Sequence, residues 1–363
     1  MRLVSPLLKH VVYPGLSKAG YLRRVARSGS AVLTYHGVLP AGYDVIDSGL
    51  DGNLVSTQLF REQLQFLKDH HNVISPEEFR MWCEGGHEMP PRSVLLTCDD
   101  GLRNSLFDML PILQEFAMKC LFFVTGASFT HTPTMLWYEE LFLMFLAAPE
   151  SFTLELPEIG LRGGIRRQEQ HSQWWALVKT LSRYDMDHRR TLVDKIRMQL
   201  GLSERWDAEY SEDPVLSRRF LAMNVQELHQ LTEAGMCIGA HTISHPLLSQ
   251  SSAEVAWREI SESKHTIEQV LEREAWAMAY PFGDSSSVSS REIQMAERAD
   301  FQCAFVNVSE DFGTQTPRFA LPRVHITAEM SLAEFDAHIS GFHRSLQELF
   351  RPARFSAAVG SNA

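Results

Sequence analysis

The chain has 363 residues, of which 44% are hydrophobic and 22% charged, a composition typical of a globular protein that can bury one large core or two smaller ones. Its formal net charge of -11 disfavours nucleic acid and other polyanions, because phosphate contacts require an excess of Lys and Arg. We therefore expect a neutral or cationic substrate and no nucleic-acid partner.

Residues 1–30 form a basic N-terminal arm, with Leu3, Leu7 and Val11 at helical spacing. No acidic residue precedes Asp44. The arm could lie on an anionic membrane surface, or pack as a helix on the rest of the protein with its basic face in water, and we favour the second. Its basic residues are Arg2, Lys9, Lys18, Arg23, Arg24 and Arg27.

From residue 31 onward, short β-type runs alternate with amphipathic helical stretches, the pattern of βα units around a parallel sheet. Their number predicts a distorted (β/α) barrel of about seven to eight parallel strands within a domain at 31–345, followed by a tail at 346–363. Helix starts are predicted at three Ser-x-x-Glu capping boxes, which begin at Ser75, Ser251 and Ser331. The expected strands are 31–35, 72–74 (weaker), 93–98, 119–124, 236–240, 276–280, 303–308 and 321–326.

The alternation stops between Thr130 and Phe220, where Leu, Trp, Arg and Gln are abundant. Helical spacing over 141–146 and 174–198 predicts a mostly helical insertion at about 130–220.

The cysteines are scattered without CxxC spacing, and several lie in apolar runs, which predicts buried, reduced thiols. Pro6, Lys9 and Pro14 interrupt the apolar runs near the start, so we expect no signal peptide. These features favour a cytoplasmic location, with the arm as a potential peripheral contact at the inner face of the membrane. The five cysteines are Cys83, Cys98, Cys120, Cys237 and Cys303.

Two adjacent carboxylates, Asp99 and Asp100, follow the apolar run at 93–98 and precede Gly101. At the end of a buried strand such a pair is costly unless a cation lies nearby. In an extended backbone the two side chains point to opposite sides, so one can bind a metal while the other lies beside a bound water. The alternative is a loop with an Asp cap, the commoner reading of this triplet alone.

Two histidines, His241 and His245, directly follow the strand predicted at 236–240. Histidines four residues apart can converge on one metal, although such a pair alone is more often incidental. Both clusters follow strands, and the carboxyl ends of the strands form the face where α/β barrels carry their sites. We therefore interpret them together as one metal site.

Four motifs in order resemble those of the polysaccharide deacetylases, carbohydrate esterase family four. Residues 97–101 (TCDDG) resemble the family's T-F-D-D-G motif, and residues 241–245 (HTISH) match its H-[ST]-x-x-H motif. Residues 280–283 (YPFG) resemble R-x-P-Y-G, and Tyr35-His36-Gly37 resembles the Y-H of the first strand. The resemblance covers roughly residues 30–345 apart from the insertion.

The resemblance implies that Asp100, His241 and His245 bind a divalent metal and that Asp99 is the general base. Zn²⁺ suits these ligands best, and Co²⁺, Ni²⁺ or Fe²⁺ would also be accepted. Three protein ligands leave an open position for water, as a catalytic site needs.

The chain departs from the family in three places. Ala279 stands where the family carries the Arg that holds the catalytic Asp, and we expect Arg323 to replace it. No convincing D-x-x-D-W element is present, since Asp284 is a poor substitute for it and reads equally well as a turn residue. The family's general acid is a late His, for which His325 and His36 compete, each with a structural role as the alternative.

The resemblance implies a hydrolase that removes N-acetyl groups from hexosamine residues of an oligo- or polysaccharide, in the making or modification of a cell-surface glycan. A deformylase or an O-deacetylase of a lipid-linked sugar is the alternative among enzymes, and a catalytically silent carbohydrate-binding protein is the alternative outside them. The insertion's tryptophans could stack on sugar rings, but a hydrophobic core for the insertion is the favoured interpretation. They are Trp137, Trp174 and Trp175.

Overall fold

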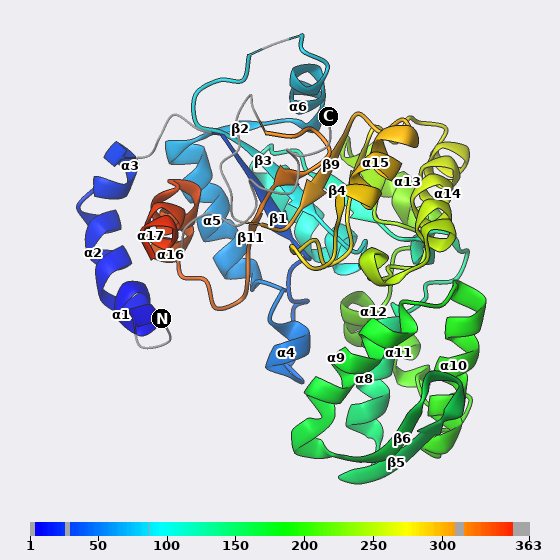
Figure 1. Ribbon diagram of the computed structural model, residues 1–363. Helices are drawn as coiled ribbons and strands as arrows, with labels where there is room; N and C mark the ends of the chain where they lie inside the picture. The colour runs from blue at the N-terminus through cyan, green and yellow to red at the C-terminus, as the bar shows by residue number, and fades with distance from the viewer. Residues whose placement is uncertain (1–3, 26–29, 87, 309–315, 351–363) are drawn as a thin grey trace.

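A parallel β-sheet surrounded by helices forms the centre of the structure, a computed structural model that describes residues 4–25, 30–86, 88–308 and 316–350 (Figure 1). Hydrogen-bonded neighbours follow the order β10, β9, β8, β7, β4, β3, β1, β11, and β2 pairs with β3. The predicted distorted barrel is confirmed as a nearly closed sheet. Its strands are β1 (Ala31–Tyr35), β2 (Asn72–Ile74), β3 (Ser93–Cys98), β4 (Leu121–Val124), β7 (Cys237–Ala240), β8 (Ala277–Ala279), β9 (Cys303–Val306), β10 (Leu321–Pro322) and β11 (Val324–His325).

The segment predicted as one strand at 321–326 closes the barrel as two short strands on either side of Arg323. In β10, Leu321 pairs with Phe305 of β9. In β11, Val324 pairs with Leu33 of β1. One short stretch of chain therefore joins both edges of the sheet, and Arg323 lies at the junction.

Two separate apolar clusters lie on the two faces of this sheet. The inner cluster includes Leu95, Phe123 and Phe305, and it is completed by Phe79 of α6 (Pro76–Cys83), whose ring centroid is 5.7 Å from that of Phe305. The outer cluster joins the other face of the strands to the surrounding helices. These include α5 (Thr57–His70), α13 (Val225–Glu233), α14 (Ala253–Leu271), α15 (Ser290–Arg298) and α16 (Leu332–Ile339).

The predicted helix caps are present with one correction. Ser75 forms a full capping box with Glu78, and Ser331 accepts a hydrogen bond from the Glu334 backbone N–H. For α14 the cap is Ser252, which accepts from Val255 N, so the prediction of Ser251 was one residue early. The Ser251 hydroxyl instead donates to a carbonyl of the insertion.

Residues 130–220 pack as a layer beside the carboxyl ends of the barrel strands, with a core of their own (Figure 1). This region contains an antiparallel pair, β5 (Ser151–Leu156) and β6 (Leu161–Arg166), which the sequence reading missed. Alternation of Phe152, Leu154 and Leu156 with polar residues was its signal. The helices are α8 (Trp137–Ala147), α9 (Gln170–Leu181), α10 (Met186–Gln199), α11 (Ala208–Glu212) and α12 (Pro214–Phe220).

The N-terminal segment forms short helices that pack on the C-terminal ones. The Tyr13 side chain is buried and its hydroxyl lies 2.6 Å from Nδ1 of His343, while Lys9 forms an ion pair with Glu334 at 3.1 Å. Leu7 and Val11 remain 56% and 59% exposed, so membrane contact stays a prediction. The helices are α1 (Val4–Leu7), a π-helical turn (Leu8–Val12), α2 (Tyr13–Lys18), α3 (Tyr21–Val25) and α17 (Phe342–Phe350).

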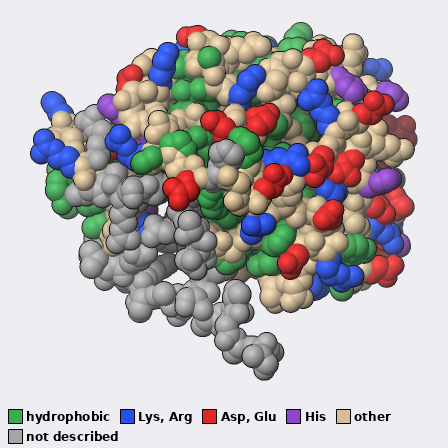
Figure 2. Space-filling model, turned by 90° about the horizontal axis from the view of Figure 1, so that it is seen from above, with side chains coloured by type: hydrophobic (Ala, Val, Ile, Leu, Met, Phe, Trp, Pro, Cys, Tyr) green, Lys and Arg blue, Asp and Glu red, His purple; other side chains and the backbone are tan. Residues whose placement is uncertain are grey.

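Several predicted features fall partly outside the described residues. Arg2, Leu3 and Arg27 of the arm are among them, as is the tail beyond residue 350, whereas 346–350 belong to α17. In the part of the chain that the structure describes, no helix has the length and apolarity to cross a membrane. Acidic and basic side chains are intermingled over much of the face shown in Figure 2.

Candidate metal and catalytic site

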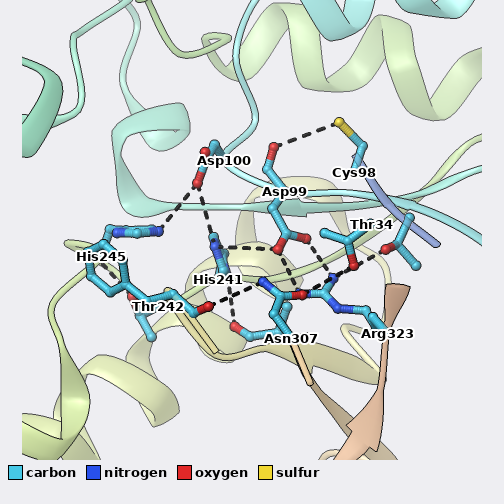
Figure 3. Close-up of polar contacts among 12 residues, drawn as sticks. Thr34, Cys98, Asp99, Asp100, His241, Thr242, His245, Asn307 and Arg323 are labelled. Carbon is cyan, nitrogen blue, oxygen red and sulfur yellow. Dashed lines mark hydrogen bonds and ion pairs between the residues drawn. The ribbon is translucent and has the colours of Figure 1, made fainter. Parts of the chain in front are cut away.

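Asp99 lies inside the mouth of the barrel, directly after β3. Its backbone continues the extended strand, and its N–H donates to Tyr35 O of β1 at 2.9 Å. Arg323 donates to both carboxylate oxygens, from Nη1 to Oδ1 at 2.8 Å and from Nη2 to Oδ2 at 2.7 Å (Figure 3). Arg323, the partner expected for Asp99, is therefore within hydrogen-bond distance of it, and its positioning role stays a prediction.

The Asp99 and Arg323 pair is almost fully shielded from water. Burial alone would raise the pKa of Asp99, but the charge and hydrogen bonds of Arg323 outweigh it and lower the pKa below its usual value. The guanidinium lies between two aromatic rings, 5.4 Å from Phe123 and 5.8 Å from Phe305. Asp99 is consequently an anion fixed in one orientation.

The chain turns sharply at Asp100, whose φ is +74°, and Gly101, whose φ is +70°. A Cβ at Gly101 would lie 3.0 Å from Val124 and Ser128, so both backbone conformation and space favour glycine. The turn carries the Asp100 carboxylate away from Arg323 and toward the two histidines (Figure 3). The two neighbouring carboxylates thus face different partners.

His241 and His245 present nitrogen atoms to the same oxygen of Asp100. The Asp100 Oδ1 atom is 3.6 Å from His241 Nε2 and 3.3 Å from His245 Nε2. The Nδ1 of His241 donates to the carbonyl oxygen of Ala279 at 2.7 Å, which leaves its Nε2 lone pair directed at the site. All three side chains are buried.

These three residues fit a divalent metal. One ligand atom from each lies within 4.8 Å of the others. The Oδ1 atom of Asp100 is buried without a hydrogen-bond partner, a costly state that a bound cation would relieve. A His, His, Asp set suits Zn²⁺ and leaves a fourth position open, although it does not define the metal.

The site concentrates backbone strain. Asp100, Thr242, His245 and Phe282 all have positive φ, between +49° and +74°. Each such residue costs on the order of 1 to 3 kcal/mol and persists only where its surroundings determine it strongly. One support is local, since His245 N donates to the Thr242 hydroxyl at 3.1 Å.

His36 and His325, the two candidates for the general acid, lie together at the mouth. Their ring centroids are 4.9 Å apart, and the buried His36 Nδ1 and His325 Nε2 have no hydrogen-bond partner. Burial, followed by the nearby His36, lowers the pKa of His325 to about 3. His325 is therefore neutral at neutral pH, which weighs against it as a ready proton donor.

Two other positions singled out from the sequence have structural roles here. Ala279 provides the carbonyl that orients His241. Asp284 accepts hydrogen bonds at Oδ1 from the backbone and the hydroxyl of Ser286, both at 2.6 Å, as a turn residue does. Its pKa is correspondingly lowered, since these bonds outweigh its partial burial.

The sequence reading missed Tyr138 and Asn307. Tyr138 comes from α8 of the insertion, and its ring centroid is 4.7 Å from that of His245. Asn307 follows β9 and donates to Phe282 O at 3.3 Å, which supports the strained backbone there. Asn307 was missed because the strand was predicted to run to residue 308, whereas β9 ends at Val306. Nothing in the local sequence of the insertion indicated that Tyr138 contacts the site.

The tryptophans of the insertion pack against its core, and two of them donate hydrogen bonds from the indole. Trp174 donates to Tyr138 O at 2.7 Å, and Trp137 donates to Ser244 O at 2.8 Å. The Trp175 ring lies 5.2 Å from that of Phe282. These contacts agree with the packing role favoured for the three residues.

Comparisons with known proteins point to the same family that the motifs resemble. The family model for polysaccharide deacetylase matches residues 202–304, which contain both histidines. The resemblance to the polysaccharide deacetylases is confirmed. No curated protein matches the sequence.

Solved deacetylase structures share the fold over most of this chain. The Streptococcus pyogenes deacetylase PplD, in complex with acetate, is 18% identical with a TM-score of 0.54 over 86% of this chain and 98% of its own. A de-N-acetylase from Aggregatibacter actinomycetemcomitans is 13% identical, with a TM-score of 0.53 over 85% and 99%. IcaB from Ammonifex degensii is 15% identical, with a TM-score of 0.52 over 86% and 97%.

The metal site of this deacetylase-like chain can be tested directly. We expect the purified protein to bind about one divalent ion per chain, because one cluster of three ligands is present among the described residues. His241→Ala or His245→Ala should abolish stoichiometric binding, measured by elemental analysis after dialysis. His188→Ala is the control, because this exposed histidine pairs with Asp185 on the surface of the insertion. Full metal occupancy in the double variant of His241 and His245 would contradict the assignment.

Proposed function

We propose that this protein is a metal-dependent hydrolase that removes N-acetyl groups from hexosamine residues of an oligo- or polysaccharide. The carrying observation is a buried carboxylate, Asp99, held by Arg323 beside the Asp100, His241 and His245 cluster. The shared fold supports this reading, and the names of its structural neighbours include a de-N-acetylase and a deacetylase bound to acetate.

The residues divide the reaction between them. A divalent metal held by Asp100, His241 and His245 would polarise the acetyl carbonyl and make a bound water more acidic. Asp99, kept ionised by Arg323, accepts the proton of the attacking water, and its Oδ2 is 3.9 Å from His241 Nε2. The amine that leaves must gain a proton, for which His36 and His325 are the two candidate donors at the mouth, and the low pKa of His325 weighs against that residue.

The silent carbohydrate-binding alternative loses part of its support. It rested on the missing Arg at position 279 and on the missing D-x-x-D-W element. Arg323 supplies a guanidinium to Asp99 from the junction of β10 and β11, so the missing Arg no longer implies a base without a fixed orientation. A cytoplasmic location, a role in cell-surface glycan metabolism and peripheral membrane contact remain predictions.

The function is tested by acetate release from N-acetylated hexosamine oligomers, with added zinc and with chelator. We expect release that chelation abolishes and metal restores. Formate release from formylated sugars, or acetate release only from O-acetylated ones, would identify the alternative enzymes. Binding of oligomers without release from any of them would instead favour the carbohydrate-binding protein.

The two adjacent carboxylates should differ in metal binding. Asp100→Asn removes a charged ligand, so metal affinity should fall by ~10-fold to ~100-fold, and excess zinc should restore part of the activity. Asp99→Asn should keep its metal while the rate falls by ~10²-fold to ~10⁴-fold, because an amide cannot accept the proton. Metal content and turnover are measured on both variants. Loss of metal from Asp99→Asn with retention by Asp100→Asn would reverse these roles.

The contact of Arg323 with both oxygens of Asp99 predicts a positioning role. Arg323→Ala should lower the rate by ~10²-fold or more with metal retained, since the base is no longer oriented. Arg323→Lys should fall between this variant and the wild type, because one ammonium group cannot match a guanidinium on two oxygens. Turnover, metal content and circular dichroism are measured together. An unchanged rate in folded Arg323→Ala would show that another group holds Asp99.

A further inference from the structure

The loop that carries the two histidines is anchored by the insertion as well as by the barrel. Arg189 Nη1 of α10 donates to the Ser244 carbonyl at 3.0 Å and to its hydroxyl at 2.7 Å. Trp137 donates to the same carbonyl at 2.8 Å. Nearby, Leu247 N donates to the Ser182 hydroxyl at 2.9 Å. Three insertion residues therefore hold the chain on both sides of His245.

The barrel holds Ser244 from the opposite side. Glu259 of α14 accepts from Ile243 N at 3.0 Å and from Ser244 N at 2.8 Å, and it also pairs with the Ser244 hydroxyl. Ser244 thus joins a cation of the insertion to an anion of the barrel. Such charge-assisted bonds are stronger and more directional than neutral ones.

Arg189 is buried, with 2% of its surface exposed. Its other donors go to Leu181 O at 3.3 Å and Tyr184 O at 2.9 Å, and its guanidinium lies 4.7 Å from the Trp137 ring. Burial lowers the pKa of Arg189 to about 10, partly offset by Glu259, so it stays charged at neutral pH. An apolar side chain could fill this space equally well. A buried cation with fixed hydrogen-bond acceptors, by contrast, favours one arrangement of the insertion and the histidine loop.

The insertion acts on His245 more directly than on His241. His245 has a φ of +49°, and its ring lies between Tyr138 of α8, at 4.7 Å, and Phe282, at 4.9 Å. His241 instead is held by the barrel, through its N–H to Val124 O and its Nδ1 to Ala279 O. The two ligand histidines therefore depend on different parts of the chain.

We propose that the insertion is part of the metal site, with Arg189 as a positioning residue that fixes His245 through Ser244. The inference rests on the metal site assigned above and deepens it. It predicts that metal affinity depends on a residue that touches neither the metal ligands nor the barrel strands. Groups that orient metal ligands typically change affinity by ~10-fold to ~100-fold.

The test compares Arg189→Ala with Arg190→Ala. Arg190 is the next residue of α10, and it binds Glu140 at 2.6 Å and Asp194 at 2.9 Å rather than the histidine loop. The dissociation constant for Zn²⁺ is measured by competition with a chelator, and circular dichroism of the metal-free proteins checks folding. We expect Arg189→Ala to bind zinc ~10-fold or more weakly and Arg190→Ala to match the wild type. Free guanidinium, well below denaturing concentrations, should restore part of the loss in Arg189→Ala.

A milder variant keeps the proposal testable if Arg189→Ala does not fold. Trp137→Phe retains a ring beside the guanidinium but loses the hydrogen bond to the Ser244 carbonyl, so its zinc affinity should fall below that of the wild type. Wild-type zinc affinity in a folded Arg189→Ala protein would overturn the positioning role. If only Trp137→Phe folds, wild-type zinc affinity in that variant would overturn it instead. Equal losses of zinc affinity in the Arg189 and Arg190 variants would also overturn it. If the wild type itself binds no zinc, the proposed metal site fails. This result is distinct from failure of the positioning role, in which the wild type and Arg189→Ala bind zinc equally well.

Discussion

The ion pair of Arg323 with Asp99 is the constraint on which the rest of the site depends. Arg323 is the residue that separates β10 from β11. The segment that joins the two edges of the sheet therefore also places a guanidinium inside the barrel. Neither charge is tolerable alone at this depth, because an unpaired buried charge costs several kcal/mol. The segment that joins the two edges of the sheet therefore also orients the ionised Asp99, and the turn at Asp100 begins from a fixed position.

The pair also explains how the chain does without an Arg at position 279. Ala279 belongs to the inner apolar cluster, on the same face of the sheet as Phe123 and Phe305, which flank the guanidinium of Arg323. Side chains from all around a small barrel point into one interior, so Arg323 can reach the same carboxylate from a different part of the sheet. The backbone carbonyl of Ala279 fixes the tautomer of His241. A backbone carbonyl of β8 therefore orients the metal ligand, while the residue between β10 and β11 orients the base.

Sequence reasoning located the elements whose signals are local. The strands were predicted from apolar runs in the sequence. The polar residues that follow these runs were expected at one end of the sheet, because parallel strands have their carboxyl ends at the same edge. Arg323 was found because a missing partner for Asp99 required a replacement. The β5 and β6 pair was missed because its alternation is short, and Tyr138 because its relation to His245 arises only when α8 packs on the barrel mouth. Contacts between segments that are distant in sequence leave no periodic pattern of residues from which they could be predicted.

Buried arginines connect parts of the chain that are distant in sequence, including the insertion and the barrel. Arg189, Arg219 and Arg323 are the bulkiest fully buried side chains in the described part of the chain. Arg219 of α12 binds Asp51 of α4 (Ser48–Asp51) at 2.6 Å and Glu139 of α8 at 3.1 Å, which ties the insertion to the helix that follows β1. Apolar contacts would allow the insertion to slide on the barrel, whereas guanidinium groups with fixed acceptors permit one docked position. The strained backbone at His245 requires that single position, because it is stable only when both neighbours hold it.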